Sequence, residues 1–313
     1  MLKRIGIDVG GTGIQVGVVD ENFRILSEDS VPTQSKLPFD EQIRQVAACV
    51  HEVIRKAGLT TDDIVSVGVG IPGIALEDGT VDKCTNMGWD HVPFRSEFIK
   101  HLDKPVYIDN DANVAALAES HAGVSAGTSS SVFITIGTGI GSGIILNGKI
   151  WKGFHGIGGE LGHVIMDLDG EPCTCGNRGC LERYCSATAI IRMGRQAARE
   201  YPDSLLNQYT GGNEELITAK VVFDAAKAGD PAASGVYRRF IDYLSQAIAS
   251  VVNFFDPEII VLGGGVSKAG SFLLDPVLEN YKKYVIFRDL PIPEVKLAVL
   301  GPEAGIIGAA MLS

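Results

Sequence analysis

The sequence has no long apolar run and no basic cluster. Across its 313 residues, no apolar stretch approaches the roughly 18 residues of a membrane-spanning helix. Lys and Arg number 27 against 38 Asp and Glu, giving a net charge of −11, and no Lys/Arg-rich run is present to neutralise the phosphates of a nucleic acid. We therefore expect neither a membrane nor a nucleic acid as a partner.

Two common nucleotide-binding signatures are also missing. There is no G-x-x-x-x-G-K-[ST], and no G-x-G-x-x-G opens a helix after the first strand with an acidic residue downstream. P-loop and dinucleotide-binding folds are therefore disfavoured. The strand-like residues before Asp8 run directly into a glycine motif, so we expect no signal peptide and no N-terminal DNA-binding module. A cytoplasmic location follows, where disulfides are rare and the six cysteines need another explanation.

What the sequence does contain is glycine and enough apolar residues for more than one core. Glycine accounts for 38 of 313 residues, roughly 12% against a usual share of about 7%. Hydrophobic residues make up 45% and charged residues 21%, which is typical of a globular protein. The length favours two domains with the active site in the cleft between them.

Apolar spacing and turn residues predict an α/β protein built from two similar halves. Strands are expected at residues 2–8, 14–19, 24–32, 64–70, 105–109, 131–137, 141–146 and 258–262. Helices are expected at residues 40–57, 112–121, 187–200, 218–228, 232–255 and 303–312. A glycine turn follows the first strand of each half. This duplicated arrangement is typical of the two-domain actin-like and hexokinase-like (ribonuclease H-like) ATPase fold, with residues 1–111 plus about 303–313 as the smaller domain and 112–302 as the larger.

The two glycine turns are candidate phosphate sites. In the first turn, Gly10 and Gly11 bring backbone N–H groups close to a phosphate, Thr12 adds a hydroxyl donor and Asp8 could hold Mg²⁺ through water. A plain hairpin turn is the alternative. The second turn, 137–141, contains Gly137, Thr138 and Gly139, and a third glycine loop contains Gly264 and Gly265, where an adenosine could lie against bare backbone.

Three cysteines crowd into one short glycine-bearing loop. Cys173, Cys175 and Cys180 lie within eight residues, a spacing suited to a tetrahedral ion. His163, ten residues earlier, is the nearest fourth ligand, and a Cys₃His set fills the shell and indicates structural zinc. Cys185 is the competing ligand, but it falls at an expected helix start. The remaining cysteines are expected to be packing residues.

Polar residues gather at the end of one expected strand and around the cysteine loop. Residues 109–113 read Asp-Asn-Asp-Ala-Asn between a strand and a helix, where α/β proteins bind ligands. Phosphoryl transfer to a hydroxyl needs a carboxylate near the attacking oxygen, although helix capping explains at least one of these side chains. Glu160 and Glu182 flank the cysteine loop and, with His163, could bind sugar hydroxyls; each glutamate alone is more often a solvated charge.

Together these segments resemble the ROK family of bacterial sugar kinases and related repressors over essentially the whole chain. The most specific match is Cys173-x-Cys175-Gly-x-x-Gly179-Cys180-x-Glu182, which fits the family pattern CxCGxxGCxE. Glu160-x-Gly162-His163 fits ExGH. The Asp8 glycine turn, the segment 110–113 and the glycines 263–265 follow the family's order. The repressors of the family carry an extra N-terminal helix-turn-helix, so from the position of Asp8 we expect this chain to belong with the kinases.

The resemblance implies roles for individual residues. Asp111 would be the catalytic base, and ATP with Mg²⁺ would bind at the glycine turns. The sugar ligands would be Asn110, Glu160, His163 and Glu182, with Gly73 in a sugar-side turn. The zinc ligands would be His163, Cys173, Cys175 and Cys180, so His163 would serve both sites.

The resemblance leaves the substrate open. ATP and a hexose are the expected partners, with glucose as the leading candidate. N-acetylmannosamine, N-acetylglucosamine and other hexoses fit the same motifs. A non-catalytic sugar sensor is the alternative of another class, and the retained turns and Asp111 argue against it. No basic groove suggests polyphosphate as donor. A homodimer is expected by analogy with related kinases.

Overall fold

The computed structural model describes residues 2–313, so Met1, the first residue of the predicted smaller domain, lies outside it. The described chain separates into two compact units. Unit 1 comprises the described residues up to Ser129 together with Gly143–Gly159 and Val299–Ser313, and unit 2 comprises Ser130–Ser142 and Glu160–Ala298. The helix that starts at Asp111 falls wholly in unit 1. The predicted domain boundary after residue 111 stays a prediction.

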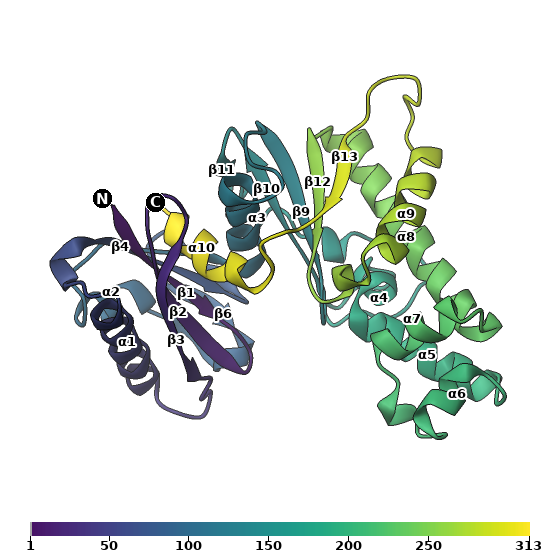
Figure 1. The fold of residues 1–313 in the computed structure, drawn as a ribbon, viewed down its shortest axis with the longest axis horizontal. Helices are drawn as coiled ribbons and strands as arrows, with labels where there is room; N and C mark the ends of the chain where they lie inside the picture. The colour runs from purple at the N-terminus through teal and green to yellow at the C-terminus, as the bar shows by residue number, and fades with distance from the viewer. Residues whose placement is uncertain (1) are drawn as a thin grey trace. The chain divides into compact units, whose positions relative to one another are not determined.

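Unit 1 is organised around a five-stranded sheet with the strand order β3-β2-β1-β4-β8 (Figure 1). The first three strands are antiparallel, as predicted. Strand β4 pairs parallel to β1, and β8 pairs parallel to β4. Helix α1 packs its apolar stripe against this sheet, with Ile43, Val50 and Val53 fully buried. The bounds are β1 Lys3–Val9, β2 Gly13–Val19, β3 Ile25–Pro32, α1 Phe39–Lys56, β4 Ile64–Ile71, β8 Val106–Asn110 and α3 Asp111–Ala122.

The second five-stranded sheet repeats the order of the first: β11-β10-β9-β12-β13. If the strands of each sheet are numbered one to five in chain order, both sheets have the order three, two, one, four, five. This agreement confirms the predicted duplication. It also identifies β11 and β13 as the third and fifth strands, which were not predicted because they span only two and four residues. The bounds are β9 Ser130–Ile136, β10 Ile140–Leu146, β11 Lys149–Ile150, β12 Ile259–Gly263 and β13 Glu294–Leu297.

The last helix, α10 (Ala304–Met311), lies directly on the backbone of the first sheet in unit 1. A Cβ atom at Gly6 of β1 would overlap the carbonyl oxygen of Ile306, and one at Gly68 of β4 would overlap that of Ala309. The contact is therefore possible only because both strands carry glycine where the helix passes. Ile306 and Ile307 fill the space on either side.

The remaining elements lie outside the two large sheets. A small antiparallel sheet has the order β5-β6-β7, and the helices α4 to α9 all lie in unit 2. The helices at 187–200, 218–228 and 232–255 are confirmed within one residue at each end. The bounds are β5 Ile74–Ala75, β6 Val81–Cys84, β7 Trp89–Val92, α2 Phe94–Ile99, α4 Glu182–Cys185, α5 Ala187–Glu200, α6 Leu205–Thr210, α7 Ala219–Lys227, α8 Pro231–Phe255 and α9 Ser271–Asn280.

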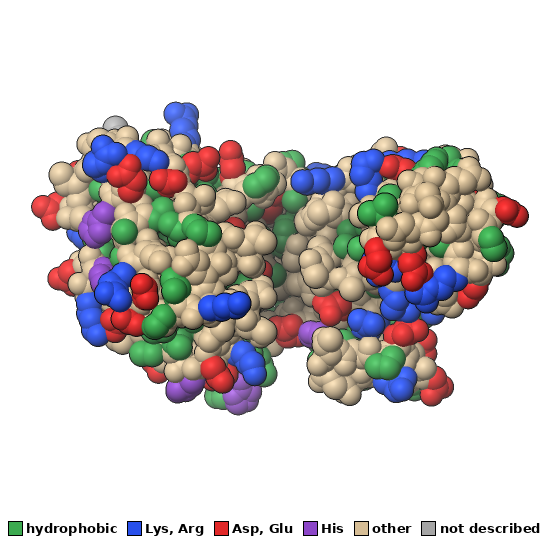
Figure 2. Space-filling view, turned by 90° about the horizontal axis from the view of Figure 1, so that it is seen from below, with side chains coloured by type: hydrophobic (Ala, Val, Ile, Leu, Met, Phe, Trp, Pro, Cys, Tyr) green, Lys and Arg blue, Asp and Glu red, His purple; other side chains and the backbone are tan. Residues whose placement is uncertain are grey.

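The surface agrees with the charge pattern of the sequence. On the face shown in Figure 2, Lys and Arg side chains are interspersed with Asp and Glu, without a stripe of one sign. Within residues 2–313, no helix combines the length and apolar character needed to cross a membrane.

Candidate functional site

The first glycine turn connects β1 to β2 and is held by hydrogen bonds within the turn and from Thr33, whose N–H also donates to the Thr12 carbonyl at 3.2 Å. The Gly10 N–H donates to the Gly13 carbonyl at 3.0 Å, and the Thr33 hydroxyl donates to the Gly10 carbonyl at 2.7 Å. Asp8 lies just before the turn, and burial raises the pKa of its carboxyl group. A buried carboxylate is stabilised by a nearby cation; that Asp8 holds Mg²⁺ stays a prediction. Thr33 gave no sequence signal, since it is a lone threonine after an edge strand.

The two glycines of this turn are not required for the same reason. A Cβ atom at Gly10 would lie 2.8 Å from the Gly13 carbonyl oxygen, so the tight turn itself excludes a side chain there. At Gly11 a Cβ atom would lie 3.5 Å from Asn86 Nδ2, an ordinary contact, and φ is not in the left-handed region. The geometry of the turn therefore accounts for glycine at Gly10 but not at Gly11. Gly11 and Thr12 are exposed, and their binding of a phosphate stays a prediction.

The second glycine turn connects β9 to β10 and is tied to the start of α5. The Gly137 N–H donates to the Gly139 carbonyl at 3.0 Å, and the Ala187 N–H donates to the Gly137 carbonyl at 2.8 Å. The Thr188 hydroxyl donates to the Thr138 carbonyl at 2.7 Å. The start of α5 therefore anchors this turn through two hydrogen bonds.

Glu182 packs against this second turn. Its Oε2 accepts a hydrogen bond from the Ile140 N–H at 2.9 Å, and a Cβ atom at Gly139 would overlap that same oxygen. The sequence prediction made Glu182 a sugar ligand, and the structure adds that one carboxylate oxygen is held by the glycine turn. The nearby loop glycine, Gly264, has φ +84° and leaves no room for a side chain, because a Cβ would lie 2.6 Å from the Ile136 nitrogen.

Asp111 is the first residue of α3, immediately after β8. Asn110 is the N-cap: its Oδ1 accepts from the Ala112 N–H at 2.9 Å, while its Nδ2 donates to the Gly73 carbonyl at 3.2 Å. The prediction that one polar residue here caps the helix is confirmed, and the cap is Asn110. The structure thus brings Gly73, Asn110 and Asp111 together within unit 1. The carboxylate starts a helix whose position is fixed by the cap on one side and the Gly73 turn on the other.

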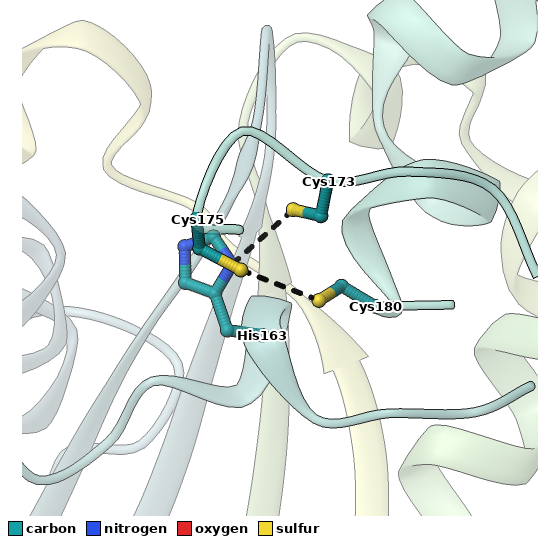
Figure 3. A group of neighbouring side chains, drawn as sticks. All are labelled: His163, Cys173, Cys175 and Cys180. Carbon is teal, nitrogen blue, oxygen red and sulfur yellow. Dashed lines mark hydrogen bonds between the residues drawn. The ribbon is translucent and has the colours of Figure 1, made fainter. Parts of the chain in front are cut away.

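The four predicted metal ligands converge in unit 2. His163 ends a short 3₁₀ turn (Leu161–His163), and the cysteines come from the loop before α4. One ligand atom of each residue lies within 4.8 Å of the others. Figure 3 shows the imidazole and the three sulfurs pointing toward one another, with Cys173 Sγ 3.7 Å from His163 Nδ1 and Cys175 Sγ 3.6 Å from Cys180 Sγ.

The competing ligand, Cys185, is engaged elsewhere: it is fully buried, and its thiol donates to the Phe240 carbonyl at 3.7 Å. Within the cluster the thiols differ. Burial raises the pKa of Cys180 to about 12, whereas the Asn177 N–H lowers that of the exposed Cys175. Soft sulfur donors with one imidazole in this compact arrangement fit a tetrahedral zinc ion.

Glu160 and His163 are held by β10. The Leu161 N–H, between them, donates to the Ser142 hydroxyl at 3.2 Å, and Gly162 lies so close to the Ile140 carbonyl that a side chain would overlap it. Glu160 is exposed, which leaves its carboxylate available to a polar ligand. Of the predicted sugar ligands, Glu160, His163 and Glu182 therefore lie in unit 2, and Asn110 lies in unit 1.

Comparisons with known proteins agree with this arrangement. The ROK family profile matches residues 4–313. A glucokinase of Thermotoga maritima is 39% identical, with 99% of this chain and 97% of that protein covered. An N-acetyl-D-glucosamine kinase of Yersinia pseudotuberculosis is 30% identical over 98% of this chain and 97% of its own length.

Solved structures give the same picture. The ROK family glucokinase of Streptomyces griseus, in complex with glucose and AMPPNP, superposes with a TM-score of 0.82 at 34% identity and 98% coverage of both chains. The ROK hexokinase of Thermus thermophilus gives a TM-score of 0.85 at 34% identity, covering 99% of this chain and 97% of that one. The duplicated sheets are thus those of the two-domain actin-like sugar kinase fold, and the chain belongs to the ROK family.

Proposed function

We propose that this protein is an ATP-dependent glucokinase, which transfers the γ-phosphoryl group of ATP to the 6-hydroxyl of D-glucose. The observation that carries the proposal is Asp111 at the β8–α3 junction, in a chain that matches known glucokinases over nearly its full length. A carboxylate at the start of a capped helix has a fixed position from which to approach a substrate hydroxyl. Glucose comes from the relatives, since carboxylates that bind hydroxyls do not distinguish one hexose from another.

In this mechanism Asp111 accepts the proton of the attacking hydroxyl as the oxygen–phosphorus bond forms. Asn110 orients the sugar beside it, and its own amide is held by the Gly73 carbonyl at 3.2 Å. Glu160, His163 and Glu182 bind the other hydroxyls of the ring. Phosphoryl transfer depends mostly on positioning and on stabilising charge on the phosphoryl oxygens, so rigid placement of these groups supplies much of the catalysis.

The glycine turns would hold the nucleotide. Residues 10–12 and 137–139 offer backbone N–H groups and the hydroxyls of Thr12 and Thr138 to the phosphates, and Gly264 and Gly265 offer bare backbone to the nucleoside. Since the turn itself does not require glycine at Gly11, its role in this proposal is to let a phosphate approach the backbone. Mg²⁺, held on the side of Asp8, would neutralise charge on the phosphates.

A structural zinc would be held by His163, Cys173, Cys175 and Cys180. Four protein ligands leave no open coordination position, so the ion would order the loop and take no part in the chemistry. Because His163 offers a second ring nitrogen, the ion would also fix its orientation toward the sugar. The sequence around this loop therefore links metal binding to sugar binding.

The test is ADP release, measured with a panel of hexoses and N-acetylhexosamines. We expect the highest kcat/KM with glucose; a preference for N-acetylglucosamine or N-acetylmannosamine would correct the substrate.

Asp111→Asn should lower kcat by about 10² to 10⁴, since it keeps the shape and removes the base. Asp103→Asn, an exposed aspartate before β8, is the control and should leave kcat unchanged. A wild-type protein that binds sugar but shows no sugar-dependent ADP release would favour the sensor instead. The same preparation tests the predicted homodimer by light scattering.

A further inference from the structure

Next to the candidate base lies a buried carboxylate that the proposed mechanism does not use. Asp109, the penultimate residue of β8, is only 4% exposed. Its Oδ1 accepts from the Asn110 N–H at 2.8 Å and from Asn113 Nδ2 at 2.9 Å. Its Oδ2 pairs with Lys152 Nζ at 2.5 Å. Buried charges need partners, and here one oxygen contacts the start of α3 while the other contacts a lysine some forty residues away in the sequence.

The amide of Asn113 contacts Asp109 through its nitrogen only. This side chain lies on the first turn of the helix and is 6% exposed. Its Nδ2 donates to Asp109, whereas its Oδ1 is buried with no hydrogen-bond partner among residues 2–313. The Asp109 carboxylate is thus the group that orients the Asn113 amide. Through Asn110 and Asn113 it holds residues on both sides of Asp111.

A glycine-rich loop follows Lys152, and its two ends meet at Lys152 and Gly158, which we call the neck of the loop. The Lys152 carbonyl accepts from the Gly158 N–H at 2.7 Å, and the Trp151 N–H before it donates to the Ile144 carbonyl of β10 at 2.8 Å. A Cβ atom at Gly158 would lie 2.9 Å from the Lys152 oxygen, so this neck is close-packed. The loop holds four glycines, and the chain then continues to Glu160.

We propose that Asp109 and Lys152 are positioning residues whose ion pair fixes the first turn of α3, and with it Asp111, against the neck of the loop that precedes Glu160. The proposal rests on the kinase function proposed above. The lysine side chain is 40% exposed and the aspartate side chain 5% exposed. When the pair is broken, the lysine therefore moves into water, and the aspartate stays buried with its remaining contacts on α3.

The two partners can be separated by substitution. Asp109→Asn keeps an oxygen for Asn110 and Asn113 but presents an amide to Lys152, so it releases mainly the loop neck. Lys152→Met also leaves the Asp109 charge buried and unpaired, which disturbs α3 as well. Combining both removes the unpaired charge. If Lys152→Met fails to fold, the double variant therefore still tests the positioning role of the pair.

The experiment compares the kinetics of these variants on the preferred hexose. Small misplacements of reacting groups reduce rates by up to about 10². We expect Asp109→Asn and Lys152→Met to lower kcat about ten- to a hundredfold, with KM for ATP within about twofold and the double variant no worse than the poorer single. Lys152→Arg, which keeps the charge, should retain most of kcat. Lys149→Met, an exposed lysine on β11, is the matched control and should behave as wild type.

Hydrogen exchange gives a second readout that needs no turnover. Amides of residues 111–116 should exchange faster in Lys152→Met than in wild type and in Lys149→Met. Wild-type kcat in the folded single and double variants, or unchanged exchange in α3, would overturn the positioning role. A wild-type protein that phosphorylates no sugar would contradict the kinase proposal instead, and the exchange experiment would still decide whether the pair holds α3.

Discussion

At the scale of single residues, the role proposed for Asp8, holding Mg²⁺ as an ionised carboxylate, lowers the stability of the folded protein. Burial raises the pKa of this carboxyl group, so the folded protein favours its neutral form. The stability associated with Asp8 is therefore complete below its unfolded-state pKa and is lost as the pH rises through the folded-state pKa. The charge at neutral pH is a cost that binding of a cation would offset.

Replacing Asp8 by Asn should make this cost visible. Asn keeps the shape and cannot ionise, so Asp8→Asn should raise Tm at pH 8, by more than at pH 4.5, in the absence of metal and nucleotide. The same variant should lose most of its ATP turnover. Thermal denaturation of both proteins at the two pH values checks the prediction. Equal Tm differences at both pH values would mean that the Asp8 charge carries no such penalty.

The neighbouring residues 109–113 show where sequence reasoning stopped. The strand–polar–helix pattern was enough to predict a helix cap and a candidate base, because capping depends on residues adjacent in sequence. It did not reveal that Asp109 pairs with Lys152, because Asp109 lies in β8 and Lys152 follows β11, and only the fold brings these distant parts of the sequence together. Asn110 is the cap, and Asp109 forms an ion pair with Lys152 instead.

At the scale of secondary-structure elements, long periodic segments were predicted within one or two residues of their observed ends. The helix expected at 40–57 is α1, Phe39–Lys56, and that at 232–255 is α8, Pro231–Phe255. Among the elements that escaped prediction, α9 has ten residues with a proline inside the helix, whereas β5, β11 and α6 have only two, two and six. So few residues show no period, and their pairing partners, which the sequence does not show, determine their structure.

The contact between α10 and the first sheet gives a sharp test at this scale. A methyl group at Gly68 would overlap the carbonyl of Ala309, and neither backbone has room to yield. Gly68→Ala should therefore cost about 3 kcal/mol or more, the upper end of overpacking. Gly235→Ala adds the same methyl group at an exposed position inside α8 with open space around it, and should stabilise by up to about 1 kcal/mol. Urea denaturation of both variants compares them; equal effects would contradict the close approach of α10.

The cysteine loop should depend on its metal. We expect about one zinc per chain, because the Cys₃His set is complete and close-packed. Cys175→Ser should lose the ion and raise KM for sugar, since His163 and Glu182 lie on the same loop region. Cys49→Ala, in α1, should retain it. Metal analysis of the purified proteins decides the matter, and wild-type protein without zinc would contradict the assignment.

At the scale of the whole molecule, unit 1 is assembled from three separate stretches of chain. Its C-terminal stretch is anchored by Glu119 of α3, which is 1% exposed and whose Oε1 accepts from the Val299 and Leu300 N–H groups at 2.9 and 3.0 Å. Oε2 of the same carboxylate accepts from the Val124 N–H at 2.9 Å. A single buried carboxylate thus satisfies backbone donors from two distant parts of the sequence.

Deleting residues 299–313 should therefore unfold unit 1 selectively. The deletion uncovers the glycine-lined face of β1 and β4 and leaves the Glu119 carboxylate without two of its donors. We expect rapid hydrogen exchange in β1 and β4, with continued protection in α5 and α8 of unit 2. Protected β1 and β4 in the truncated protein would show that unit 1 is stable without α10.

The position of α10 at the end of the chain also fixes an order of events during translation. The ribosome makes the first sheet early, but the helix that covers it follows only after the whole of residues 130–298. At synthesis rates of about 5–20 residues per second, the wait is roughly 8 to 34 seconds. During that interval the nascent sheet carries bare glycine backbone flanked by apolar side chains. The sheet that is made first therefore receives its covering helix only when synthesis of the chain is almost complete.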